Sequence, residues 1–167
     1  ISQNNTVAVV DVLHQTVAKI LLPVSNPKLW WVDEPTLYKV KTVVKLDGKI
    51  VDNLTTSCGF RTIKFTADSG FYLNDTWMKI KGTCNHQDHA GVGSALPDYL
   101  QYYRIRLLKN MGSNAYRASH NAPTPELLDA CDSLGMLVMD EQRLLNSSTE
   151  YMNQFERLVK RDRSRAS

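Results

Sequence analysis

The sequence predicts a chain of two parts, a β-sandwich of immunoglobulin type followed by the opening of a parallel α/β sheet. Three observations favour this division. Short strand-like runs separated by turn residues fill the first 65 residues or so, strands alternate with amphipathic helices afterwards, and each later strand ends in polar residues. With 167 residues, 43% hydrophobic residues and a net charge of +3, the chain has the composition of an ordered globular protein.

The first part, residues 1–65, carries about six expected strands. Val, Ile and Leu enrich residues 6–12 and 16–22, and residues 37–44 alternate between apolar and polar side chains. The pair Asp47-Gly48 indicates a tight hairpin, because both turn positions require a positive φ. Further strands are expected at residues 54–58 and 60–65. The Cys…Trp…Cys spacing of true immunoglobulin domains is absent, and the sandwich is expected to be incomplete on its N-terminal side.

The second part, residues 66–167, begins with a polar turn and a short hairpin over residues 71–81. About three strand–helix units follow, which is the opening of either a parallel barrel or a doubly wound sheet. The expected strands span residues 78–84, 114–119 and 136–139, and the expected helices span residues 97–111, 124–135 and 150–161.

The helix boundaries follow from local signals. Pro97 begins the first helix and Gly112 follows its end, while Thr124 caps the second helix, Pro125 takes its first position and Gly135 ends it. Apolar side chains recur at helical spacing. They form one apolar face in the first helix (Leu100, Tyr103, Leu107, Leu108, Met111) and are expected to point inward in the last (Met152, Phe155, Leu158, Val159).

Composition and motifs exclude several classes of function. No basic face runs through the chain, so a nucleic-acid partner is not expected, and the basic cluster at residues 160–165 is expected to be a solvated tail. No apolar run is long enough to cross a membrane. No Gly-rich phosphate loop follows a strand, so no nucleotide cofactor is expected. Cys58, Cys84 and Cys131 are odd in number and far apart, which fits neither a disulfide framework nor a zinc site.

Polar residues gather where the three later strands end. In parallel α/β folds these ends form one functional edge. The first strand leads into residues 85–89, the second into residues 117–121 and the third into residues 140–143. Imidazole, guanidinium, amide and carboxylate groups there suit a polyhydroxylated ligand such as a sugar, because each hydroxyl both donates and accepts a hydrogen bond. The candidate ligand-binding residues are His86, Arg117, His120, Asn121 and Glu141.

Other chemistries remain open for the same side chains. A metal hydrolase would use the imidazoles and carboxylate of His86, Asp88, His89 and His120, although no further ligand motif supports it. Nucleophilic hydrolysis by Ser119, His120 and Asp140 is disfavoured, because a serine and a histidine that are adjacent in sequence cannot easily face each other.

The two neighbouring carboxylates and the arginine also have alternative interpretations. Asp140 and Glu141 are neighbours on a strand and point to opposite faces, so at most one, expected to be Glu141, faces the site. Arg117 has a purely structural alternative as an ion pair inside the sheet.

Short motifs follow one another along the whole chain in a characteristic order. They are PKLW (27–30), PTLY (35–38), CGFRTI (58–63), GFYLN (70–74), KGTCNH (81–86), NAYRASHNAP (114–123) and LDACD (128–132) with Asp140-Glu141. In this order and spacing they resemble glycoside hydrolase family 2, which contains β-galactosidases, β-mannosidases and β-glucuronidases. The resemblance covers nearly the whole chain and is nearest to the β-galactosidase branch.

The resemblance implies an immunoglobulin-like sandwich followed by the first three or so units of a (β/α)8 TIM barrel. It implies that His86 and His120 bind substrate hydroxyls, that Arg117 sits beneath the catalytic carboxylates, and that Glu141 lies near the sugar. The family reaction is retaining hydrolysis by two glutamates whose carboxyl groups are about 5–5.5 Å apart. The implied ligand is a β-galactoside or a related sugar, without a cofactor.

The sequence departs from the family pattern at its end and after its third barrel strand. The family's two catalytic glutamates belong to later strands, so neither is expected in this chain. Residues 164–167 stand where the family reads Asn-His-Pro, which suggests a frameshift, a truncated gene or an artificial boundary. Residues 143–146 replace the Glu-Thr-His-Gly magnesium motif of some relatives, so no such metal site is expected.

We therefore expect a piece of a retaining β-glycosidase that is inactive alone. The remainder of the barrel or a homo-oligomer would cover its open sheet edge. The alternatives are a non-catalytic carbohydrate-binding module, or β-glucuronidase or β-mannosidase specificity.

Overall fold

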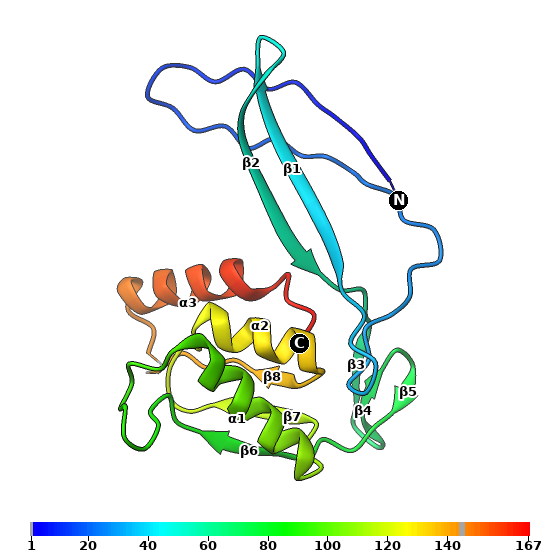
Figure 1. The fold of residues 1–167 in the computed structure, drawn as a ribbon, viewed down its shortest axis with the longest axis vertical. Coiled ribbons are helices and arrows are strands. Elements are labelled where there is room, and N and C mark those ends of the chain that lie inside the picture. Colours follow the sequence, from blue (N-terminus) through cyan, green and yellow to red (C-terminus); the bar gives the residue numbers. More distant parts are fainter. Residues whose placement is uncertain (1, 144–145) are drawn as a thin grey trace.

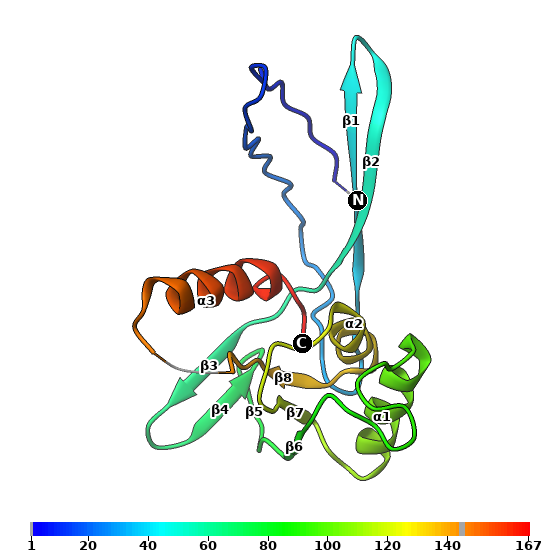
Figure 2. The same ribbon diagram turned by 90° about the vertical axis from the view of Figure 1, so that its left-hand side faces the viewer.

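The computed structural model describes residues 2–143 and 146–167. A long β-hairpin and an irregular N-terminal segment project away from an α/β body, as Figures 1 and 2 show from two sides. The body contains a three-stranded antiparallel sheet and a three-stranded parallel sheet with three helices. No helix within these residues is long and apolar enough to cross a membrane.

The projecting hairpin consists of β1 (Tyr38–Leu46) and β2 (Lys49–Cys58). The two strands pair in antiparallel register from Tyr38–Cys58 to Leu46–Lys49, with one irregularity after Val44. The predicted turn is confirmed, because Asp47 and Gly48 have φ values of 49° and 78°.

The prediction of strands over residues 6–12 and 16–22 was wrong. These segments form no strand, and only side-chain bonds join them, from Asn4 Nδ2 to Leu21 O (2.9 Å) and from Thr16 Oγ1 to Val9 O (3.2 Å). A strand requires a backbone ladder with a partner, and a run of β-favouring residues does not supply one. The apolar side chains of these segments are exposed; Leu13 is 99% exposed.

The chain then forms β3 (Ile63–Thr66), β4 (Gly70–Leu73) and β5 (Thr76–Trp77), an antiparallel sheet in that order. This confirms the predicted hairpin after residue 70, although its second strand is shorter than expected. The first strand of the parallel sheet begins four residues later than predicted, because residues 78–81 are not part of it.

The parallel sheet consists of β6 (Gly82–Asn85), β7 (Ala115–Ala118) and β8 (Leu137–Met139), in the order β6-β7-β8. The connecting helices α1 (Asp98–Asn110) and α2 (Pro125–Leu134) pack against each other, and α3 (Thr149–Asp162) follows β8. Thr124 accepts a hydrogen bond from Leu127 N, and Gly135 ends α2 with a φ of 75°, so both predicted caps of α2 are confirmed.

The faces of two helices differ from the prediction. In α1 the buried side chains are Gln101 and Ile105, whereas Leu107 and Met111 are exposed. In α3 only Leu158 is buried, and the other apolar residues are about half exposed (Met152, Phe155, Val159). Helical spacing identifies an apolar stripe, but the neighbouring elements decide which part of that stripe is covered.

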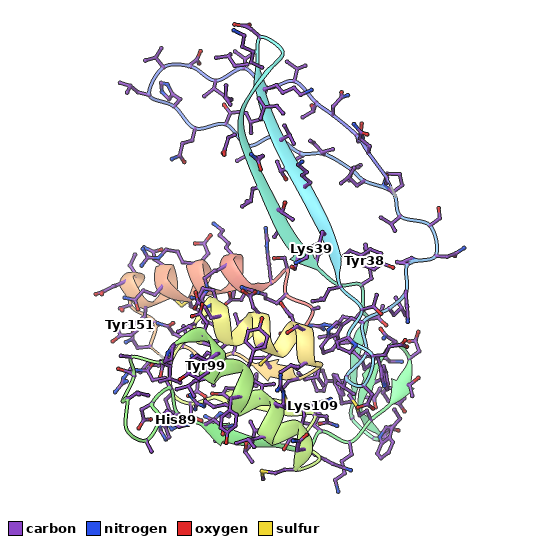
Figure 3. All side chains as sticks on the ribbon, in the orientation of Figure 1. Tyr38, Lys39, His89, Tyr99, Lys109 and Tyr151 are labelled. Atoms are coloured by element: carbon purple, nitrogen blue, oxygen red, sulfur yellow. The ribbon has the colours of Figure 1, made fainter. Side chains whose placement is uncertain are left out.

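A core cluster around Trp30 joins the N-terminal region to the α/β body. Trp30 is fully buried and packs with Val32, Leu73 and Leu137. Its indole Nε1 donates to Asp132 O of α2 (2.8 Å). Lys109, at the C-terminal end of α1 in Figure 3, adds bonds to the carbonyls of Val32 (2.5 Å) and Gly135 (3.1 Å).

The prediction of a solvated basic tail was wrong for its last part. Arg165 forms ion pairs with Asp129 and with Asp132 Oδ2 (3.2 Å for the latter), and Arg61 donates to Ala166 O. Ala166 and Ser167 are buried, and Ser167 O accepts from Val138 N of β8 (3.2 Å). The carboxylates of Asp129 and Asp132 on α2 hold residues 165–167 in place. The basic cluster alone does not indicate these partners, because they lie far away in the sequence.

Candidate active site

The carboxyl ends of β6, β7 and β8 bring the predicted polar residues together. Parallel pairing aligns Cys84 with Arg117 and Arg117 with Met139, so the segments after the three strands leave the sheet at one edge. An open cavity of about 570 Å³ lies there. Its lining consists of His86, Gln87, Asp88, Ser94, His120, Asn121 and Arg143.

Glu141 is the centre of the polar network. Its Oε2 accepts from Arg117 Nε (2.8 Å), and its Oε1 lies 2.8 Å from His120 Nδ1. The hydrogen bond from His120, and then the charge of Arg117, hold the pKa of the Glu141 carboxyl below its ordinary value. The side chain of Glu141 is 19% exposed, and we infer a carboxylate that stays charged at neutral pH.

Arg117 is held from two sides. Its NH1 donates to Cys84 Sγ (3.4 Å) on β6, while Nε donates to Glu141. The contact with Cys84 and the charge of Glu141 raise the pKa of Arg117 above its ordinary value. The structural ion pair considered above therefore exists, and it lies within the polar network of the site.

Two imidazoles and two amides meet in the cavity. The rings of His86 and His120 lie edge to face with centroids 5.4 Å apart. Asn121 Nδ2 donates to Gln87 Oε1 (2.6 Å), which links the segments after β6 and β7. Nδ1 of His120 is engaged by Glu141, which leaves Nε2 as the ring nitrogen for a ligand.

Asp140 has surroundings unlike those of its neighbour Glu141. Its Oδ1 accepts from Glu141 N (2.8 Å). Burial, and then the nearby carboxyl of Asp162, raise the pKa of Asp140 to about 6. Asp140 is therefore directed toward α3, while Glu141 contacts Arg117 and His120.

The structure assembles the five predicted residues in two layers. His86, His120 and Asn121 line the cavity. Behind them, Glu141 contacts His120, and Arg117 contacts Glu141. Sequence reasoning missed Ser94, which also lines the cavity. The sequence signal for it is the closely spaced pair Gly91 and Gly93. Both glycines have positive φ in the structure, and His89 pairs with Gly93, so the loop folds back.

Two alternative chemistries find no support in this geometry. In the part of the chain that the structure describes, no group of three or more His, Cys, Asp or Glu side chains is placed to hold a metal ion. The Ser119 hydroxyl is buried and bonds to none of the described residues, so it is not presented as a nucleophile. Leu144 and Leu145, part of the stretch that replaces the magnesium motif, lie outside the described residues.

Comparisons with known proteins identify the family of the chain. Residues 64–165 match the model of the glycosyl hydrolases family 2 TIM barrel domain, and residues 1–61 match a second model of glycosyl hydrolases family 2. A putative β-glucuronidase of Formosa agariphila is 45% identical over 123 residues, which are 73% of this chain and 12% of that protein. A β-galactosidase of Bacteroides ovatus is 39% identical over 145 residues, which are 84% of this chain and 17% of that protein.

Solved structures give the same result. A family 2 glycosyl hydrolase from Bacteroides cellulosilyticus aligns with a TM-score of 0.74 and 40% identity, covering 84% of this chain and 20% of that one. The chain thus spans less than a fifth of the length of the curated relatives named above. It belongs to glycosyl hydrolase family 2 and carries residues of both the immunoglobulin-like and the TIM-barrel domains of that family.

Proposed function

We propose that this chain forms part of the sugar-binding mouth of a retaining β-glycosidase that hydrolyses terminal β-galactosides. The observation that carries the proposal is the network of Arg117, Glu141 and His120 beside a polar cavity at the carboxyl edge of parallel strands. In barrels of this kind the active site lies at that edge. The β-galactosidase relative from Bacteroides ovatus supports the choice of sugar.

The network provides directed hydrogen bonds to hydroxyl groups. Arg117 and His120 keep Glu141 ionised, and Glu141 fixes the ring orientation of His120. With Nδ1 engaged, Nε2 of His120 interacts with a sugar hydroxyl, and His86 and Asn121 add further polar contacts in the cavity. A site of this type rejects analogues that lack the matching hydroxyl, because its polar groups would remain unpaired.

We propose that the chain alone does not hydrolyse glycosides. Retaining hydrolysis needs two carboxyl groups about 5–5.5 Å apart on either side of the scissile bond. Glu141 is engaged by Arg117 and His120, and Asp140 is directed toward Asp162, so these neighbours do not form such a pair. The role of the chain is to bind the sugar, and carboxylates on further barrel strands would complete the reaction.

We place the domain boundary at residues 65 and 66, between the sandwich part and the barrel part. In this proposal the edge of the parallel sheet beyond β8 is covered by the remainder of the barrel or by a second copy. Unpaired strand edges of this kind readily bind another strand.

A second specificity, for β-glucuronides, is favoured by one observation. Arg143 lines the cavity, and a guanidinium there would pair with the carboxylate of a uronic acid. The β-glucuronidase relatives make this the main alternative to β-galactosides. A β-mannoside, and a role in carbohydrate binding without hydrolysis, are the remaining alternatives.

A chimeric enzyme tests the proposal. Residues 64–165 replace the matching segment of the Bacteroides ovatus β-galactosidase, and the chimera is assayed with p-nitrophenyl β-galactoside, β-glucuronide and β-mannoside. We expect turnover of the galactoside, with a loss of at least about a hundredfold in His120→Ala. Arg106→Ala, an exposed change on α1, is the matched control.

Each other outcome has a definite meaning. If the chimera prefers the glucuronide and this preference is lost in Arg143→Gln, the proposed substrate is a β-glucuronide and not a β-galactoside. A folded chimera that binds these sugars without hydrolysis would favour the binding module. A folded chimera that neither binds nor hydrolyses any of the three would contradict the proposed function.

A further inference from the structure

We infer that Arg104 is a positioning residue that holds the loop after β6, so that His86 faces His120 across the cavity. Arg104 lies in the middle of α1 and does not line the cavity itself. It reaches the loop from behind, and it acts on a ligand only through His86. The consequence for sugar binding rests on the proposed function, whereas the effect on His86 does not.

Three consecutive carbonyls, at the last residue of β6 and the first two residues of the loop, accept hydrogen bonds from the side chains of Arg104 and Tyr116. Arg104 NH2 donates to His86 O, and Arg104 NH1 donates to Gln87 O (3.2 Å). Tyr116 Oη lies 3.4 Å from Asn85 O, which also accepts from Ser119 N (3.1 Å). A guanidinium presents its donors in a rigid plane, so one side chain fixes two neighbouring peptide groups at once.

The position of Arg104 is itself well determined. The preceding turn of α1 buries Gln101, the next residue is the fully buried Ile105, and Tyr116 of β7 packs in the same core. Arg104, Gln101 and Tyr116 also line a second cavity of about 290 Å³, which shares Gln87, Ser94 and Asn121 with the first. The packed layer of α1 and β7 therefore sets where the guanidinium lies, and the guanidinium sets where the loop lies.

The pairing of His89 with Gly93 restrains the loop internally but does not attach it to the rest of the chain. His86 and the residues after it are largely exposed, and outside the Arg104 contact the loop side chains are held mainly by Asn121 at Gln87. Exposed loops sample many conformations unless they are anchored. The ring separation of 5.4 Å between His86 and His120 requires both segments to be fixed.

Histidine-selective NMR of the 167-residue chain tests the inference. The chain has four histidines, so each ring signal can be assigned and His14 serves as an exposed reference. We expect a proton–proton NOE between the His86 and His120 rings in the parent chain. In Arg104→Met this NOE is lost and the His86 signals move toward those of His14, while Arg104→Lys restores part of the effect.

Arg106→Met is the matched control, because it removes an exposed guanidinium from the same helix. Far-ultraviolet circular dichroism verifies that each variant is folded, and Arg104→Gln replaces Arg104→Met if the latter is not. An unchanged NOE and unchanged His86 signals in a folded Arg104 variant would overturn the inference. Equal losses in Arg106→Met would also overturn it, because they would indicate a general loosening of α1.

Sugar titration separates this inference from the proposed function. Binding of methyl β-D-galactoside is followed through the His120 signals. We expect Arg104→Met to raise the dissociation constant about tenfold. If the NOE is lost and sugar affinity is unchanged, Arg104 still positions His86, and His86 has no part in sugar binding. If the NOE is retained and sugar affinity falls tenfold, the positioning role is refuted.

Discussion

Replacing Trp30 by Phe tests how the N-terminal region is attached to the barrel part. The Trp30 indole is fully buried and donates to Asp132 O near the end of α2. Carbonyls in the last turn of a helix have no partner within it, and leaving one buried and unpaired costs about 1–3 kcal/mol. The smaller ring of Phe also loses apolar contact worth about 1 kcal/mol. We expect the free energy of unfolding to fall by about 2–4 kcal/mol.

Trp77→Phe is the matched control. The Trp77 indole also donates to a carbonyl, Ser69 O at 2.7 Å, but the residue is 57% exposed. Water replaces that hydrogen bond, so the expected change is within about 0.5 kcal/mol. Urea denaturation followed by circular dichroism measures both variants. Equal losses in the two variants, or a loss below about 0.5 kcal/mol in Trp30→Phe, would show that the buried indole does not attach the N-terminal region.

Three further predictions concern a helix end and the two carboxylates. Gly135→Ala should lower the melting temperature more than Gly91→Ala. Both glycines have positive φ, but only at Gly135 would a Cβ meet a neighbour, because it would lie 2.0 Å from Val32 O. Equal shifts in the two variants would contradict this. The pKa of Asp140 is raised to about 6, so its contribution to stability is present below its unfolded pKa and is lost as pH rises through about 6. Asp140→Asn should therefore raise the melting temperature at about pH 7.5 and have little effect near pH 4. The pKa of Glu141 is lowered, so its contribution to stability is lost as pH falls through its folded pKa. Glu141→Gln should therefore destabilise the chain at neutral pH and reduce the fall of the melting temperature at acid pH. An unchanged fall at acid pH would count against the network of Arg117, Glu141 and His120.

Local signals predicted those parts of the fold that depend on a few adjacent residues. Thr124 and Gly135 bound α2, and Asp47-Gly48 turns the hairpin, because caps and tight turns are set by φ and by side chains within a few positions. The prediction of strands at residues 6–12 and 16–22 was wrong, because a strand needs a partner that is distant in sequence. The predicted apolar face of α1 differed from the buried one for a similar reason, since the neighbouring elements cover Gln101 and Ile105.

The site was predictable where it follows from topology. Parallel strands end at one edge, so polar residues after β6, β7 and β8 had to converge, and the network of Glu141 follows from that. The role of Arg104 was not predictable, because its partners are backbone carbonyls 17 and 18 residues away. A contact with a carbonyl does not depend on which side chain the loop residue carries. The contacts of Arg165 were missed because its partners, Asp129 and Asp132, lie on α2, 36 and 33 residues earlier in the chain.

A change in the histidine ring signals on addition of sugar tests most directly whether this edge of the sheet binds a sugar. The ring signals of His14, His86, His89 and His120 are followed while methyl β-D-galactoside is added to about 100 mM, a concentration that detects dissociation constants in the millimolar range and above. We expect the signals of His86 and His120 to move in a saturable manner while those of His14 do not. Signals that stay fixed at His86 and His120, or that move equally at all four histidines, would contradict a sugar-binding mouth at the carboxyl edge of this sheet.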